Sequence, residues 1–329
     1  MAIDAFAHAL PSVCHTAADI AALTGADEQF IAEKVGLSRR YVLGADQTGV
    51  SLSADACRAL FARHPGLAEE VDVLICVTQT PDRRLPQNSA GVAAALGLPK
   101  TLASFDIALG CSGYVYALTV AEGFLQAAGR KCALVVTCDP YSRIIEPTDK
   151  DTNCLFGDAA TATVLRAGKG RGRILATDFG TRGEDGDAIC VPAGGAARPL
   201  VGAVAAEMIP AEAGDLRLHM QGRAVFNFVN SVVPDSIRAC LQNAGLTLDD
   251  IDLFALHQGS RYMLDAMAKR VGIPPHKLLQ NMANYGNTVS SSIPLLLSEQ
   301  DAAGQLDGRR VLVSGFGVGL SWATAILQF

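Results

Sequence analysis

The sequence predicts an α/β fold built from two similar halves, and three observations carry this prediction. Short continuous apolar runs, such as residues 71–80 and 309–317, are typical of strands buried on both faces. Segments with helical periodicity lie between them, for example residues 53–64 and 261–272. Segments of the first half also recur in the second half at a nearly constant offset. Buried strands that alternate with amphipathic helices indicate a sheet covered by helices on both faces.

The recurrence rests on two pairs of segments. DVLICV begins at Asp72 and resembles DLFALH, which begins at Asp252, 180 positions later. GRKCALVV begins at Gly129 and resembles GRRVLVSG, which begins at Gly308, 179 positions later. Chance resemblance between apolar strands is the alternative interpretation, but two pairs with nearly one offset favour two related halves.

We expect the chain to divide into an N-terminal half, residues 1–170, and a C-terminal half, residues 171–329. Segment 191–214 is rich in Ala, Gly and Pro, so it is predicted to be a long loop between elements. The offset places Cys111 opposite a position near residue 290. Each half therefore has a glycine-led turn into an apolar helix at the matching place.

The composition excludes several classes of protein. Half of the residues are hydrophobic and 18% are charged, which predicts a large buried core or a subunit interface as well. A net charge of −6 argues against a nucleic-acid surface. The absence of an apolar run of about 18 residues predicts no transmembrane helix, and Asp4 with no basic leader argues against a signal peptide. Nine scattered cysteines without a CxxC pair and six histidines without ligand spacing predict a cytoplasmic, metal-free protein.

Cys111 is the first candidate functional residue. It lies in DIALGCSGYVYAL, where Gly110 and Gly113 allow a tight turn and a helix is predicted to run to Gly129. A thiol at a helix N-terminus meets unpaired N–H groups and the positive end of the helix dipole, which lower its pKa. Cys111 is therefore a candidate nucleophile, and a small buried core residue is the alternative.

His257 and Asn287 are the second and third candidates. His257 ends the apolar run of residues 251–257, and α/β sheets bind ligands at the carboxyl ends of their strands. A core histidine bonded to the backbone is the alternative. Asn287 lies in NYGNTVSSSIP, at a turn that enters a helix of small residues. An ordinary turn or capping asparagine is the alternative there.

Taken together, these segments resemble the β-ketoacyl-acyl-carrier-protein synthase III group of the thiolase superfamily. DIALGCSGYVYAL resembles the nucleophile segment of that family, LHQGSR its histidine segment and YGNTVSSSIPLLL its asparagine segment. EPTDKDTNCLFGDAATATVL and GFGVGLSWATAIL also look like family segments, in the same order along nearly the whole chain. The resemblance implies a thiolase-like α-β-α-β-α layered fold, two halves with five-stranded sheets, and a homodimer.

The resemblance also implies a decarboxylative Claisen condensation without a cofactor. Cys111 would take an acyl group from a thioester. His257 and Asn287, as neutral donors, would stabilise the enolate that forms when malonyl-ACP or malonyl-CoA loses CO2. The enolate would then attack the Cys111 thioester and give a β-ketoacyl product. The oxyanion donors would be the backbone N–H groups of Cys111 and Val318. Val318 replaces the middle residue of the usual glycine triplet, so a positive φ there would be unfavourable.

Further residues match family positions around the substrate. Those matched to binding of CoA or phosphopantetheine are Phe30, Lys34, Lys150, Arg223, Phe226 and Ser260. Lys34 and Lys150 stand where arginines are usual, and lysine lacks the planar, bidentate guanidinium. The primer carrier therefore stays open between CoA and acyl carrier protein.

Three more positions carry family roles outside the pantetheine path. Leu85 matches an acyl-pocket position supplied by the partner subunit. Lys269 and Arg270 match a basic patch that docks the acidic carrier protein, and a predominantly acidic enzyme needs such a local patch.

Two alternative functions remain open at this point. One is an acyltransferase of the same fold that moves the Cys111 acyl group to an amine or hydroxyl without decarboxylation. The other is a non-catalytic partner subunit that sets chain length in a heterodimer. For the synthase itself, the pathway stays open between fatty acid initiation, polyketide or other secondary metabolism, and a polysaccharide-linked acyl chain.

Overall fold

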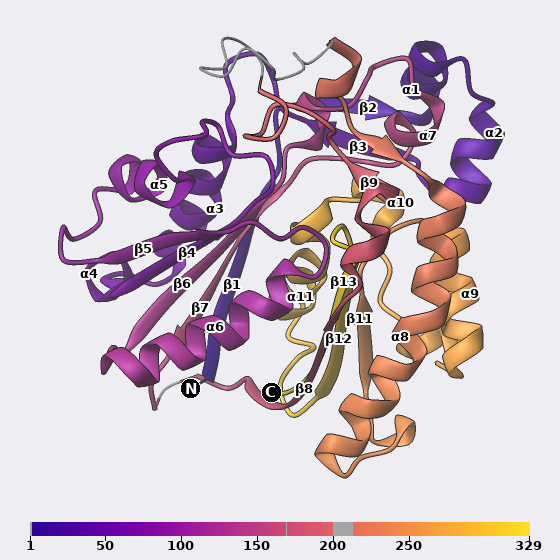
Figure 1. Ribbon diagram of the computed structural model, residues 1–329. Helices are drawn as coiled ribbons and strands as arrows, with labels where there is room; N and C mark the ends of the chain where they lie inside the picture. The colour runs from indigo at the N-terminus through magenta and orange to yellow at the C-terminus, as the bar shows by residue number, and fades with distance from the viewer. Residues whose placement is uncertain (1, 169, 200–212) are drawn as a thin grey trace.

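Two mixed β-sheets, one from each part of the chain, form the frame of the molecule (Figure 1). The computed structural model describes residues 2–168, 170–199 and 213–329. The first sheet contains, in spatial order, β1 (Ala2–Ala9), β7 (Ala160–Arg166), β6 (Cys132–Cys138), β4 (Val73–Val77) and β5 (Ala103–Ile107). The second contains β11 (Leu253–Leu256), β12 (Arg310–Gly317), β13 (Ser321–Gln328) and β8 (Arg173–Thr181). Strands β4, β5 and β6 are parallel, as are β11 and β12.

Across the described residues the second sheet has four strands, not the expected five. At the position in the second sheet that is equivalent to β5, the structure has a single parallel bridge, between Phe254 and Leu278. Pro274 and Pro275 precede this bridge and begin a 3-10 turn. Proline has no N–H to donate to a ladder, so pairing cannot extend backward along this segment.

Five layers stack as the resemblance implies, with two helices between the sheets (Figure 1). Central helix α6 (Gly113–Ala128) packs on β4 and β6 of one sheet and on β12 and β13 of the other. Central helix α11 (Ser292–Ala302) packs on β1 and β7 and on β11 and β12. The outer layers are α3 (Gly49–Arg63) and α5 (Asn88–Leu96) on one side, and α8 (Gly222–Ala244) and α9 (Arg261–Val271) on the other. The first seven residues of α11 are all buried, as expected of a helix enclosed by protein on every side.

Shorter elements complete the chain, and most of them gather at the top and upper right of Figure 1. They include a two-stranded pair, β2 (Val13–Thr16) with β3 (Arg39–Val42), and a second pair, β9 (Ile189–Cys190) with β10 (His219–Met220). The short helices are α1 (Ala17–Thr24), α2 (Glu28–Phe30), α4 (Leu67–Glu70), α7 (Lys150–Asn153) and α10 (Met282–Tyr285).

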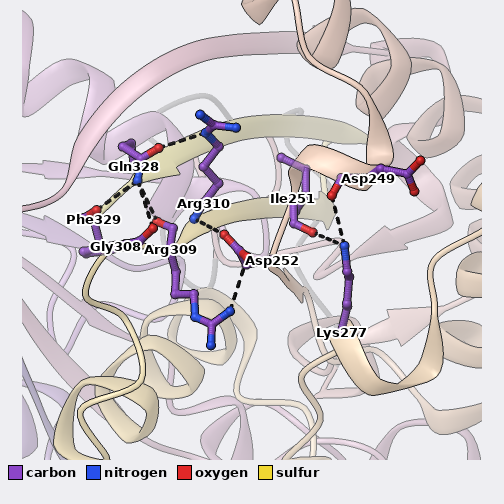
Figure 2. A network of polar contacts seen from close by, with 9 residues as sticks. All are labelled: Asp249, Ile251, Asp252, Lys277, Gly308, Arg309, Arg310, Gln328 and Phe329. Atoms are coloured by element: carbon purple, nitrogen blue, oxygen red, sulfur yellow. Dashed lines mark hydrogen bonds and ion pairs between the residues drawn. The ribbon is translucent and has the colours of Figure 1, made fainter.

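The internal repeat has a structural counterpart at the start of the paired strands β11 and β12 (Figure 2). Asp252 accepts a hydrogen bond from the backbone N–H of Arg310 at 2.8 Å and pairs with the Arg309 guanidinium at 3.3 Å. The Nε of Arg310 donates to Gln328 at 2.9 Å, which ties the end of β13 to the same corner. This carboxylate therefore fixes the register of β11 against β12.

The equivalent carboxylate of the first sheet has the same partners. Asp72 accepts a hydrogen bond from the backbone N–H of Lys131 at 2.9 Å and pairs with the Arg130 guanidinium at 3.5 Å. The acceptor positions differ by 180 residues and the donor positions by 179, the offsets found in the sequence. The repeated segments are thus equivalent strand pairs, whereas the division of domains at residue 170 stays a prediction.

The segment predicted as a long loop is irregular over residues 191–199. Residues 200–212 of that segment lie outside the described residues, and residues 213–216 form a 3-10 turn. Across the described residues, no helix combines the length and the apolar character needed to span a membrane. Over the same ranges, no group of three or more histidine, cysteine or acidic side chains is arranged to hold a metal ion.

Candidate active site

Three residues from distant segments meet at one cavity of about 290 Å³: Cys111, His257 and Asn287 all line it. Cys111 lies in the turn between β5 and α6, and His257 directly follows β11. Asn287 lies between α10 and α11. The remaining lining is mainly apolar, and it includes Phe156 and Phe316. The structure therefore brings together the three candidates that the sequence singled out.

Two glycines allow the close packing around Cys111. A Cβ atom at Gly113 would lie 2.5 Å from Cγ1 of Val77, so the first turn of α6 approaches β4 only without a side chain there. A Cβ atom at Gly317 would lie 2.8 Å from the Cys111 sulfur. The last glycine loop thus presents bare backbone to the thiol.

The backbone N–H groups of Cys111 and Val318 both act on the Cys111 sulfur in the direction that lowers its pKa. These are the two groups that the sequence nominates as oxyanion donors. Val318 has no positive φ, because the neighbouring Gly319 takes the unusual conformation with φ 139°. The departure from a glycine triplet therefore leaves the loop geometry unstrained at Val318.

The expected lowering of the Cys111 pKa is wrong. Cys111 is 5% exposed, and burial raises its pKa to about 12, with a further increase from the nearby Asp139 carboxylate. The two backbone N–H groups oppose this increase but do not overcome it. Helix α6 begins at Gly113 after its N-cap Ser112, so Cys111 precedes the first turn, where the helix dipole acts. The thiol is therefore protonated at neutral pH.

Alkylation of Cys111 by iodoacetamide is expected to accelerate with pH up to pH 10 without reaching a plateau. An ordinary thiol, with a pKa of about 8.5, levels off near pH 9.5 because it is then mostly thiolate. Peptide-resolved mass spectrometry follows Cys111, and glutathione in the same tube supplies the reference curve. A plateau for Cys111 below that of glutathione would contradict the raised pKa.

His257 is held as a neutral imidazole. Burial lowers its pKa to about 3, and a backbone hydrogen bond with Val289 partly opposes this effect. The Nδ1 atom lies 2.7 Å from the oxygen of the Ser292 hydroxyl. The imidazole ring packs edge-on against the Phe316 ring, with the two ring centroids 5.5 Å apart. Because Nδ1 is engaged, Nε2 is the nitrogen left for a ligand.

Asn287 is fixed by its backbone and by its side-chain oxygen. Its N–H donates to the Leu155 carbonyl at 2.9 Å, and its carbonyl accepts from the Gly157 N–H at 3.0 Å. Its Oδ1 accepts from the Val289 N–H at 2.9 Å. The Nδ2 hydrogens are therefore the donors that Asn287 can offer in the cavity.

Known proteins that are similar to this chain in sequence and in fold identify its family. Residues 105–183 match the model of 3-oxoacyl-[acyl-carrier-protein (ACP)] synthase III, and residues 241–329 match that of its C-terminal part. The β-ketoacyl-[acyl-carrier-protein] synthase III of Lactococcus lactis subsp. lactis is 33% identical over 325 residues, 98% of this chain and 97% of the relative. The chain belongs to the β-ketoacyl-[acyl-carrier-protein] synthase III family. It is a ketosynthase, an acyltransferase that joins acyl units by condensation.

Solved structures of synthase III enzymes agree with this assignment. A 3-oxoacyl-(acyl-carrier-protein) synthase III superposes with a TM-score of 0.91 at 37% identity, covering 100% of this chain and 99% of the other. The Thermus thermophilus enzyme superposes with a TM-score of 0.89 at 33% identity, with the same coverage. These matches extend over both sheets and confirm the thiolase-type layered fold.

A second cavity of the synthase, of about 1020 Å³, adjoins the Cys111 cavity. The two cavities share five lining residues, Leu155, Met220, Gly222, Ser260 and Tyr262. Five of the six residues matched to CoA or phosphopantetheine line the outer cavity: Phe30, Lys34, Lys150, Arg223 and Ser260. The sixth, Phe226, lines the inner one and stacks on Tyr262 with ring centroids 5.4 Å apart. All six therefore line one or the other of these two adjoining cavities.

The other nominated residues of the synthase lie away from this path. Leu85 is 85% exposed and does not line either cavity in the single chain. Lys269 and Arg270 are exposed in the last turn of α9. Their roles concern a second subunit and a carrier protein, and they stay predictions.

Asp139 is a member of the site that the sequence analysis missed. It is fully buried, accepts from the Ser290 hydroxyl at 2.5 Å and from the Gln79 N–H at 2.6 Å, and adds to the raised pKa of Cys111. Burial raises the pKa of its own carboxyl to about 6. The sequence signal that could have identified Asp139 is its position, because it directly follows the apolar strand β6, as His257 follows β11.

Replacing Asp139 with asparagine is expected to stabilise the synthase more at pH 7.5 than at pH 4.5. The carboxyl pKa rises from 3.8 unfolded to about 6 folded, so the wild type loses stability as pH rises through this window. The asparagine variant avoids this loss, which amounts to about 2 kcal/mol between the two pH values. Thermal melting of both proteins across pH 4.5–7.5 measures it. Asp46→Asn, at an exposed turn, is the control, and a pH-independent difference for Asp139→Asn would contradict the raised pKa.

Proposed function

We propose that this synthase makes β-ketoacyl thioesters in two half-reactions at Cys111, acting in the cytoplasm in fatty acid biosynthesis. The observation that carries the proposal is the convergence of Cys111, His257 and Asn287 on one cavity, with two backbone N–H groups at the sulfur. In the first half-reaction the sulfur attacks an acyl thioester. The N–H groups of Cys111 and Val318 stabilise the tetrahedral oxyanion. The thiol proton leaves on the departing thiol, so atoms and charge balance without a cofactor.

In the second half-reaction a malonyl thioester enters the same cavity. Its C–CO2 bond breaks, CO2 leaves, and Asn287 and His257 bond the oxygen of the resulting enolate. The apolar walls, including Phe156 and Phe316, favour loss of the charged carboxylate because they solvate it poorly. The enolate carbon then attacks the Cys111 thioester, the bond between the acyl carbon and the sulfur breaks, and the released thiolate takes a proton from solvent to restore the thiol. Losing one donor of this kind typically costs about 2.7–4 kcal/mol of barrier.

The substrates reach Cys111 through the outer cavity. Lys34, Lys150 and Arg223 place positive charge around its lining, which suits the phosphates of CoA or of a phosphopantetheine arm. Lys269 and Arg270 offer a local basic surface on an acidic chain, which suits an acidic acyl carrier protein.

The active species is proposed to be a homodimer formed across the β5 edge. Within the described part of the chain, β5 pairs with β4 alone, and its residues are half-buried on both faces. Exposed apolar side chains, Val120 of α6 and Phe179 of β8, extend the apolar surface beyond this edge. A second copy would cover this surface and bring Leu85 toward the partner's acyl pocket.

Intact-mass analysis after incubation with a panel of acyl-CoAs and acyl carrier protein thioesters tests the proposal. One stable adduct on Cys111 is expected, followed by its loss and by CO2 release when malonyl-ACP is added. Transfer of the acyl group to an amine or hydroxyl without CO2 would instead assign the protein to the non-decarboxylating acyltransferases. Absence of any adduct with either carrier would overturn the assignment of Cys111.

A further inference from the structure

The Ser292 hydroxyl contacts His257, a residue of the active site in which both half-reactions proposed above take place. It is the first residue of α11 and is 1% exposed. Its oxygen lies 2.7 Å from Nδ1 of His257 and 3.0 Å from the carbonyl oxygen of Val289. A serine hydroxyl carries one proton, so it donates to only one of these two acceptors at a time.

The choice between them determines which nitrogen of His257 carries the ring proton. When the hydroxyl donates to the Val289 carbonyl, its lone pair accepts a hydrogen bond from Nδ1–H, and Nε2 carries no proton. When the hydroxyl donates to Nδ1, that nitrogen must be unprotonated, and the neutral ring carries its proton on Nε2. Burial keeps the imidazole neutral, so these two tautomers are the relevant forms.

The two half-reactions require different forms of His257. Cys111 begins as a neutral thiol, so acyl loading needs an acceptor for its proton, and bare Nε2 supplies one. Condensation needs a donor to the enolate oxygen, and Nε2–H supplies that. We propose that Ser292 is a positioning residue whose hydroxyl, by turning between Val289 and His257, lets one imidazole serve as acceptor in acyl loading and as donor in condensation.

The proton balance of this proposal closes. During loading the sulfur–acyl bond forms as the bond to the carrier thiol breaks, and the S–H proton passes through Nε2 to the departing thiol in the same concerted step, so no imidazolium accumulates. His257 is then neutral again with its proton on Nδ1. Between the half-reactions the ring changes tautomer by proton exchange with solvent: Nε2 gains a proton, Nδ1 loses one, and the Ser292 hydroxyl turns toward Nδ1. The Cys111 thiolate released at the end of condensation takes one further proton from solvent.

Val289 provides a fixed second acceptor for this exchange. Among the described residues, Val289 is the one non-glycine residue with a positive φ, 53°. A β-branched residue is rarely found in this conformation. Its N–H donates to Asn287 and its carbonyl accepts from Ser292. The backbone at Val289 therefore orients both polar partners of the enolate at once.

Ser292→Ala tests the inference, which rests on the proposed function. Without the hydroxyl, no donor holds the Nε2–H tautomer. Condensation of the preformed acyl-enzyme with malonyl-ACP is expected to slow about 10²-fold, while acyl loading stays within about threefold of wild type. Ser292→Thr keeps a hydroxyl and is expected to recover most of the condensation rate. NMR of ¹⁵N-histidine enzyme is expected to show His257 only as the Nδ1–H tautomer in Ser292→Ala.

Ser298→Ala is the matched control, because Ser298 lies in the same helix and its hydroxyl contacts Nδ1 of His8 at 2.9 Å, away from the cavity. Its two half-reactions are expected to match those of wild type. If Ser292→Ala slows both half-reactions equally, or neither, the inference is overturned. If wild-type enzyme neither loads an acyl group nor releases CO2, the proposed function itself fails.

Discussion

Replacing Cys111 with alanine is expected to abolish acyl loading and to lower condensation by at least about 10⁴-fold, because no other group in the cavity can form the thioester. The variant is nevertheless expected to keep releasing CO2 from malonyl thioester. His257 and Asn287 stay in place, and the methyl group of alanine leaves the apolar cavity intact. Intact mass reports the loss of loading, and labelled CO2 reports the retained decarboxylation.

The comparison separates the nucleophile from the enolate site. Cys14→Ala serves as a control, since Cys14 is an exposed free cysteine and its removal is expected to leave both measurements unchanged. Loss of CO2 release in Cys111→Ala would mean that decarboxylation depends on the acyl-enzyme. The two half-reactions would then be coupled more tightly than the geometry indicates.

Asn287→Asp is expected to lower condensation about 10³-fold with little effect on acyl loading. Aspartate has the same shape and keeps the acceptor for the Val289 N–H, so the loop is preserved. The Nδ2 donor becomes a carboxylate oxygen, which repels both the malonyl carboxylate and the enolate. Single-turnover condensation on preformed acyl-enzyme measures the effect.

A matched variant tests whether an added negative charge lowers the condensation rate by itself. Asn284→Asp introduces the same carboxylate on the exposed part of α10, three residues earlier, and is expected to condense at the wild-type rate. If Asn287→Asp also condenses normally, Asn287 has no role as an enolate donor. Equal loss of loading and condensation would point to a distorted loop.

Much of this architecture could be predicted from the sequence, because its signals are local. The repeated Asp–Arg segments predict equivalent strand pairs, and Asp72 and Asp252 keep the same partners in the structure. The apolar run before His257 and the glycine turn at Cys111 predict positions at strand and helix ends. The motifs nominated three residues that line one cavity.

The rest depends on packing between segments distant in the chain. The direction of the Cys111 pKa shift follows from burial by the last glycine loop, two hundred positions away, which a helix-end argument does not include. The role of the Ser292 hydroxyl depends on a contact with His257, 35 residues earlier. Among the described residues the second sheet has four strands, and the two prolines that limit further pairing there, Pro274 and Pro275, are visible in the sequence.

The position of α11 has a consequence for synthesis of the chain. This helix, residues 292–302, covers β1 and β7, which are complete once residue 166 has been made. Helix α6 already covers β4 and β6 on this face, but β1 and β7 stay without their covering helix through more than a third of translation. During that interval the nascent chain exposes the apolar side chains of β1 and β7, a state prone to association with other nascent chains. The placing of α11 between the two sheets thus makes the N-terminal region depend on a C-terminal segment for the burial of β1 and β7.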